Sequence, residues 1–134
     1  MDMILPSVFL RRALLLDAAC SGAMGLLLAV AAAPLGWWFH LPEALLRESG
    51  LFLLAFAAAL AWLGTRSAVP RWAVLGVIIG NALWAIDSVL LLLPGWIAPN
   101  WLGGGFILAQ AVVVAALAEL EYVGLQRSAR AARA

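Results

Sequence analysis

Four apolar stretches, each about as long as a membrane-spanning helix, constrain this chain more than any other feature of its sequence. They run approximately over residues 10–33, 42–64, 70–93 and 102–124. A helix of about 20 apolar residues crosses the roughly 30 Å hydrocarbon core of a bilayer. Only 11% of the 134 residues are charged, against about 25% in a soluble domain. We therefore predict an all-α fold, a four-helix transmembrane bundle that forms one integral membrane domain over residues 1–134.

The positions of the arginines predict how this bundle is oriented. Seven of the eight basic residues lie at the start of the first stretch, around the connection between the second and the third, or after the fourth: Arg11, Arg12, Arg66, Arg71, Arg127, Arg130 and Arg133. With four crossings, these three places lie on the same side of the membrane, and cytoplasmic segments carry the excess of basic residues. Only Arg47 lies on the other side. We predict that both termini are cytoplasmic (N-in, C-in) and that the protein is a multi-pass protein of the bacterial cytoplasmic, or inner, membrane.

The tryptophans favour the same arrangement. Six of the seven fall near the predicted ends of the spans: Trp37, Trp38, Trp62, Trp72, Trp96 and Trp101. An indole ring is most stable at the interface between hydrocarbon and water. The two outer segments also share a Pro-Gly-Trp pattern, at 34–37 and 94–96, so an origin from two related helical hairpins is left open.

The composition excludes several kinds of functional site. Cys20 is the only cysteine and His40 the only histidine, so a Cys/His metal cluster or a Cys–His nucleophile pair lacks its residues. We predict no catalytic residue, no metal and no cofactor. An enzyme that acts on a lipid through a carboxylate such as Asp87 is the less favoured alternative. The net charge of +1 gives no reason to expect nucleic acid as a partner, whereas membrane lipid is expected.

Three acidic residues lie toward the inner ends of the predicted spans: Asp17, Glu119 and Glu121. An ionisable group at membrane depth needs a partner or a purpose. The favoured interpretation is a collar of ion pairs with the arginines nearby. In the alternative, Asp17 shares one helix face with Cys20 and Ser21, faces a cavity, and binds a proton or a cation.

A second polar group is predicted in the outer half of the bundle. Asn81, Trp84 and Asp87 lie along the third span, and Gln110 lies on the fourth; Asp87 and Gln110 are roughly 9 and 12 Å from the outer ends of their spans. Arg47 lies about 7 Å inside the second span if that helix begins at residue 42. We predict a partly buried ion pair between Arg47 and Asp87, with Gln110 hydrogen-bonded nearby. The alternative is a pocket for a lipid, quinone or cation, lined by Asn81, Trp84, Asp87 and Gln110.

Small residues four positions apart indicate faces where helices can pack closely. Gly76 and Gly80 form such a pair on the third span, and Ala18 and Gly22 form another on the first. Lipid gives no hydrophobic drive for helix association, so close backbone packing matters more than in water. The sequence leaves open whether these faces pack within the chain or against another subunit.

Two short pieces of sequence, Gly80-Asn81-Ala82-Leu83-Trp84 and Ala118-Glu119-Leu120-Glu121-Tyr122, accompany this hydropathy pattern. With them the chain resembles small bacterial four-helix membrane proteins of the DoxX-like group. The resemblance covers most of the chain and implies no catalytic residue. We expect a non-enzymatic structural or accessory subunit of a membrane protein complex, with a membrane-protein partner or self-association. The alternative is a small-molecule binding protein or transporter that acts as a homo-oligomer.

Overall fold

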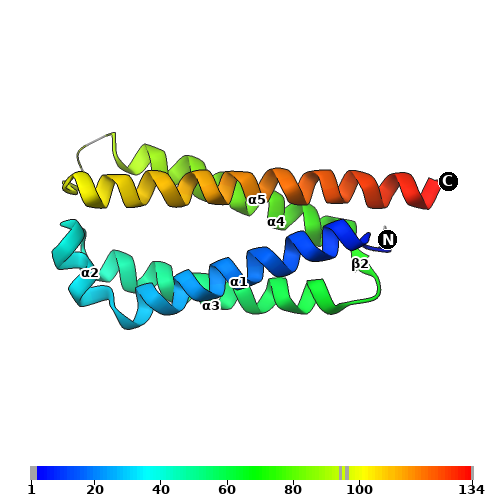
Figure 1. Cartoon of the computed structure of the whole chain (residues 1–134), viewed down its shortest axis with the longest axis horizontal. Coiled ribbons are helices and arrows are strands. Elements are labelled where there is room, and N and C mark those ends of the chain that lie inside the picture. The colour runs from blue at the N-terminus through cyan, green and yellow to red at the C-terminus, as the bar shows by residue number, and fades with distance from the viewer. Residues whose placement is uncertain (1–2, 94, 96, 134) are drawn as a thin grey trace.

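A computed structural model describes residues 3–93, 95 and 97–133 and confirms the all-α bundle (Figure 1). Its four long helices are α1 (Val8–Val30), α3 (Glu43–Thr65), α4 (Arg71–Leu91) and α5 (Trp101–Arg133). All four are long and apolar enough to cross a membrane, so the chain has the architecture of a multi-pass membrane protein. Residue Trp96 of the predicted outer aromatic set lies outside the described residues.

Local chemistry explains where these helices begin. The Ser7 side chain accepts a hydrogen bond from the Leu10 N–H at 3.1 Å and so caps α1. Pro42 and Pro70 occupy the capping positions of α3 and α4, where extended backbone turns into helix. The Asn100 side chain accepts from the N–H of a glycine in the first turn of α5, at 2.8 Å. The capping side chains satisfy N–H groups that have no partner inside the helix.

A short helix at the outer end, α2 (Ala32–Phe39), is absent from the sequence prediction, which extends the first span into it. Pro34 falls in its first turn, where a missing N–H costs little. The helix ends at His40, whose φ of 53° is left-handed. The Asn100 side chain donates to the Trp38 carbonyl at 2.7 Å, which fastens α2 to the start of α5.

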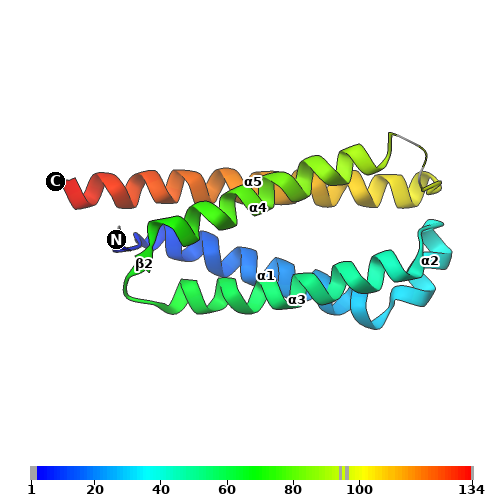
Figure 2. The same cartoon turned by 180° about the vertical axis from the view of Figure 1, so that it is seen from behind.

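The helices form two antiparallel hairpins, α1 with α3 and α4 with α5, which lie against each other as two layers (Figures 1 and 2). Within the first hairpin, Gly25 and Gly50 mark a close crossing, since a Cβ on Gly50 would lie 2.7 Å from the Gly25 carbonyl oxygen. Between the layers, Gly124 of α5 packs on Leu10 of α1, and a Cβ there would lie 2.8 Å from the Leu10 Cα. α4 crosses α5 obliquely, behind it in Figure 1 and in front of it in Figure 2.

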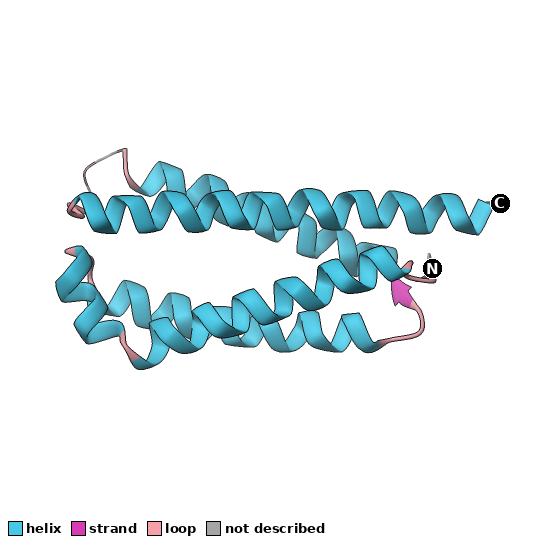
Figure 3. Ribbon diagram, in the orientation of Figure 1, coloured by secondary structure: helices cyan, strands magenta, loops and turns pink. Residues whose placement is uncertain are grey.

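Both described ends of the chain lie at one end of the bundle, called here the inner end after the predicted orientation (Figure 1). Two short strands meet there, β1 (Met3–Ile4) and β2 (Val69–Pro70), which pair antiparallel (Figure 3). The Ser7 N–H donates to the Ser128 side chain at 2.9 Å. The start of the chain is thereby joined to the α3–α4 connection and to α5.

The small-residue faces predicted from the sequence do not all pack inside the chain. On α1, a Cβ on Gly22 would lie 3.6 Å from the Ala57 side chain of α3. On α4, a Cβ on Gly76 or Gly80 would meet no described atom within 4 Å. The α4 pair therefore belongs to the outer surface of the bundle.

Two apolar clusters fill the interior, one toward each end of the bundle. The inner cluster includes Leu10, Leu14, Leu60, Val74 and Leu125. The outer cluster includes Leu28, Phe39, Leu46, Leu53 and Ile107. Four of the five buried polar residues, on α1, α4 and α5, fall between these two clusters; the fifth, Ser128, lies at the inner end beside Ser7.

Candidate functional site

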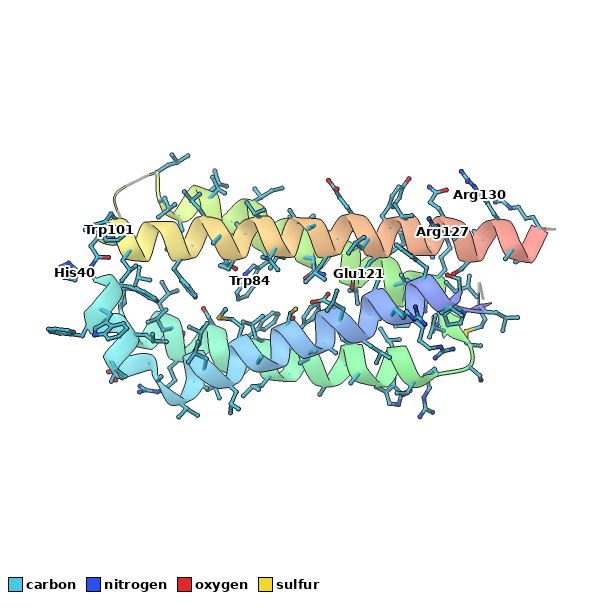
Figure 4. All side chains as sticks on the ribbon, viewed as in Figure 1. His40, Trp84, Trp101, Glu121, Arg127 and Arg130 are labelled. Atoms are coloured by element: carbon cyan, nitrogen blue, oxygen red, sulfur yellow. The ribbon has the colours of Figure 1, made fainter. Side chains whose placement is uncertain are left out.

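Four polar side chains from three helices meet in the interior, and we call them the carboxylate cluster. Asp17 and Ser21 come from α1, Asn81 from α4 and Glu121 from α5; each is at most 8% exposed. The Asn81 amide donates both to Asp17 Oδ2, at 2.7 Å, and to Glu121 Oε1, at 2.8 Å. The Ser21 hydroxyl donates to Asp17 Oδ1 at 2.9 Å. One neutral amide thus bridges two carboxyl groups (Glu121 is labelled in Figure 4).

The two carboxyl groups of this cluster are not equally satisfied. Both oxygens of Asp17 accept hydrogen bonds. Glu121 Oε2 is buried and has no hydrogen-bond partner among the described residues. A buried polar atom without a partner is costly and in native proteins calls for an explanation such as a proton, water or ion.

The predicted collar of ion pairs is not formed in the part of the chain that the structure describes. Arg11 donates instead to the Gly64 carbonyl at 2.7 Å, and Arg127 lies over the Phe9 ring at 4.3 Å. These two arginines thus contact a carbonyl and an aromatic ring at the inner end, and no basic side chain among the described residues pairs with the carboxylate cluster.

The cluster lies further from the inner helix ends than the predicted spans imply, because α1 begins two residues earlier and α5 ends nine residues later. Asp17 is nine residues, about 14 Å, from the start of α1. Asn81 is ten residues, about 15 Å, into α4, near its middle. Glu121 is twelve residues, about 18 Å, from the end of α5 at Arg133. Together with their burial, these positions place the polar groups in the interior of the bundle.

In the outer half, the structure brings together only part of the predicted group. The Trp84 indole N–H donates to Gln110 Oε1 at 2.9 Å and joins α4 to α5. Asp87 is exposed and enters no ion pair among the described residues. Six residues separate Asn81 from Asp87, about 240° around the helix, so the first faces inward when the second faces out.

The predicted ion pair between Arg47 and Asp87 is likewise not formed. Within the described residues the one ion pair joins Arg47 to Glu43, at 3.0 Å, on the surface of α3. Glu43 is four residues before Arg47, which is the favourable order and spacing for such a pair on one helix. That spacing is visible in the sequence and is the signal that should have identified the partner.

Two cavities adjoin the carboxylate cluster, and Ser21 lines both. The first, of about 240 Å³, is apolar over most of its wall and also borders Cys20, Trp84 and Gln110. The second, of about 200 Å³, borders Asn81, Trp84 and Asp87. Trp84 projects into the space between the two layers (Figure 4) and forms part of both walls.

The chain matches no protein-family model, no curated protein and no solved structure. The resemblance to the DoxX-like group therefore stays a prediction. Among the described residues, no group of three His, Cys, Asp or Glu side chains could hold a metal ion. Function is inferred below from the carboxylate cluster and its cavities.

Proposed function

We propose that this protein is a small-molecule binding protein or transporter of the bacterial inner membrane, with a cation site at Asp17 and Glu121. The observation that carries the proposal is the pair of buried carboxyl groups on the single Asn81 amide, with Glu121 Oε2 left without a partner. In this proposal the site holds one positive charge. That charge is a proton when no other cation is bound.

Electrostatics favours one positive charge at this site. Two ionised carboxylates around one neutral amide repel each other strongly where the dielectric constant is low. α4 contributes only the neutral Asn81, and the buried residues of α3 between 50 and 64 are Gly, Leu and Ala. A single proton shared by Asp17 and Glu121 removes one charge and turns an acceptor into a donor.

Infrared spectroscopy of the protein in lipid nanodiscs tests this proposal, because a protonated carboxyl group has its own C=O stretching band. We expect that band at neutral pH, changed in Asp17→Asn and absent in Glu121→Gln. Glu119→Gln is the matched control, since Glu119 is exposed on the same helix, and the band should persist there. A wild-type protein without the band, both carboxylates being ionised, overturns the proposal.

A role as an accessory subunit is the second candidate, and one observation favours it. The outward face of α4 carries Gly76 and Gly80, which leave space beside them, and the exposed carboxylate of Asp87. Small residues four apart admit a second helix at close range. Co-purification of a stoichiometric membrane protein that is lost in Gly80→Ile would support this candidate; a purely monomeric protein from native membranes would contradict it.

A further inference from the structure

We propose that the cavities beside the carboxylate cluster bind a hydrophobic amine in its protonated form, admitted from the lipid between α3 and α4. This inference rests on the proposed cation site and adds the chemical class of the ligand and its route. Three observations carry it: the apolar wall of the larger cavity, the hydrogen-bond acceptors at its polar side, and the composition of the opening.

The larger cavity has the size and surface for the apolar part of such a ligand. Its volume of about 240 Å³ is bordered by Leu53, Phe106, Val113 and Leu117. An apolar cavity of about 150 Å³ holds benzene. There is therefore room for an aromatic ring with a short aliphatic chain.

Where the cavities meet the carboxylate cluster, at Ser21 and Asn81, they present acceptors to a ligand. The hydroxyl hydrogen of Ser21 is directed to Asp17, and both amide hydrogens of Asn81 are directed to carboxylates. What these two residues can still offer are lone pairs on oxygen. A ligand that binds there must donate hydrogen bonds, as an ammonium group does and a carboxylate does not.

The charges around the cavities also favour a cationic ligand. Asp87 borders the smaller cavity, and Asp17 and Glu121 lie directly behind the residues that line it. None of the arginines that the structure describes borders either cavity. An anionic ligand such as a fatty acid would meet only like charge, whereas a cation gains from all three carboxyl groups.

The opening to the lipid lies between α3 and α4 and carries aromatic rings. Phe52 is 57% exposed and its ring stacks on Trp84 with centroids 5.7 Å apart. Phe52, Trp84 and the exposed Asp87 border the same cavity, which ends at Ser21 and Asn81. Aromatic faces and a carboxylate both attract a cation that arrives with its apolar part in lipid.

Once bound, the ammonium group supplies the positive charge that the shared proton supplies in the empty site. The proton then leaves to water, and the net charge of the site does not change. Binding of the amine should therefore weaken the infrared band of the protonated carboxyl group. A neutral ligand of the same shape should leave that band in place.

Cys20 provides a direct test, because it is the only cysteine of the chain and borders the larger cavity. We measure the rate at which N-ethylmaleimide labels Cys20 in lipid nanodiscs, with phenylbutylamine, phenylbutanol or phenylbutyrate present. The amine at about ten times its Kd should slow labelling roughly tenfold. The alcohol and the acid should have little effect. If the alcohol protects Cys20 as well as the amine does, the site does not recognise the positive charge and the proposal is wrong.

Two further variants keep this test independent of folding defects in the carboxylate cluster. Ala109 borders the larger cavity, so Ala109→Phe should fill it and abolish protection by the amine. Val112 is 69% exposed, so Val112→Phe on the neighbouring face should retain protection. If the infrared band is present but the amine fails to protect Cys20, the ligand class is wrong and the cation site stands. If the band is absent as well, both proposals fail.

Discussion

At the scale of single residues, Asn81 is the side chain that connects the carboxyl groups in the shared interior of three helices. It is the one hydrogen-bond donor shared by Asp17 and Glu121, and it lies near the middle of α4. An amide is suited to this position because its two N–H groups can serve two acceptors while adding no charge. The consequence is that the two carboxyl groups are held close together without neutralising one another.

We predict that Asn81→Leu lowers the free energy of unfolding by about 1 to 2 kcal/mol, since it removes two interhelical hydrogen bonds, each worth about 0.6 kcal/mol or more in a membrane. Gln126→Leu is the control, because this amide bonds only to the exposed Tyr122 of its own helix at 2.7 Å. Unfolding by sodium dodecyl sulfate in mixed micelles measures both. An equal effect of the two substitutions would mean that Asn81 does not join the helices.

A second prediction at this scale concerns the pair that the sequence indicated and the structure does not form. The Arg47–Glu43 pair is about half exposed on both sides, so Arg47→Leu should change stability by no more than about 0.5 kcal/mol. A double-mutant cycle of Arg47→Leu with Asp87→Leu should give a coupling energy near zero. A coupling energy well above zero would show that Arg47 and Asp87 interact, as the sequence predicts.

The residues of the carboxylate cluster could be predicted from the sequence only one by one. Asp17 and Ser21 were placed on one face because their spacing of four is local. Asn81 and Asp17 are 64 positions apart, and helical periodicity states which residues share a face but not which faces meet. The sequence places Glu121 near an inner helix end because the fourth apolar run stops at 124, whereas α5 continues to Arg133.

At the scale of the helices, the four spans were predictable because each is a long apolar run, but two of their ends were not. Gly124 ends the predicted fourth span, whereas α5 continues past it to Arg133 and uses Gly124 for its contact with Leu10. The sequence does not predict α2, because Pro34 is typical of a helix end, whereas here it fits the first turn of a new helix. The positions of such helix ends depend on contacts with other helices, and a local sequence pattern does not contain that information.

Gly50 lies in the close crossing of α1 and α3, whereas Gly80 lies on the open face of α4. The contrast gives a prediction for the packing of α1 on α3. A Cβ on Gly50 would lie 2.5 Å from the Ala29 backbone nitrogen, so Gly50→Ala should destabilise the protein by about 1 to 3 kcal/mol through overpacking. Gly80 has open space, so Gly80→Ala should be neutral or stabilising, by up to about 1 kcal/mol of helix propensity. The same mixed-micelle unfolding experiment compares them; destabilisation by Gly80→Ala would indicate that a partner covers α4.

At the scale of the whole molecule, the cavities exist because two hairpins meet as layers. α1 and α5 approach closely at Gly124, toward the inner end, and the larger cavity lies beyond that contact, beside Trp84 and Gln110. The carboxylate cluster lies between the inner contact and the cavity. If the predicted orientation holds, the cluster is nearer the cytoplasm, and the opening at Asp87 belongs to the outer leaflet.

That orientation can be tested on the intact protein, and the direction of any transport depends on it. In a Cys20→Ser background, His40→Cys places a thiol at the end that carries α2, and Ser67→Cys places one in the α3–α4 connection (His40 is labelled in Figure 4). Because seven of eight arginines lie at the inner end, that end should face the cytoplasm. A membrane-impermeant maleimide should label His40→Cys in intact cells and Ser67→Cys only after permeabilisation. The reverse pattern would invert the topology and place the opening at Asp87 in the cytoplasmic leaflet, while labelling of both in intact cells would indicate insertion in two orientations.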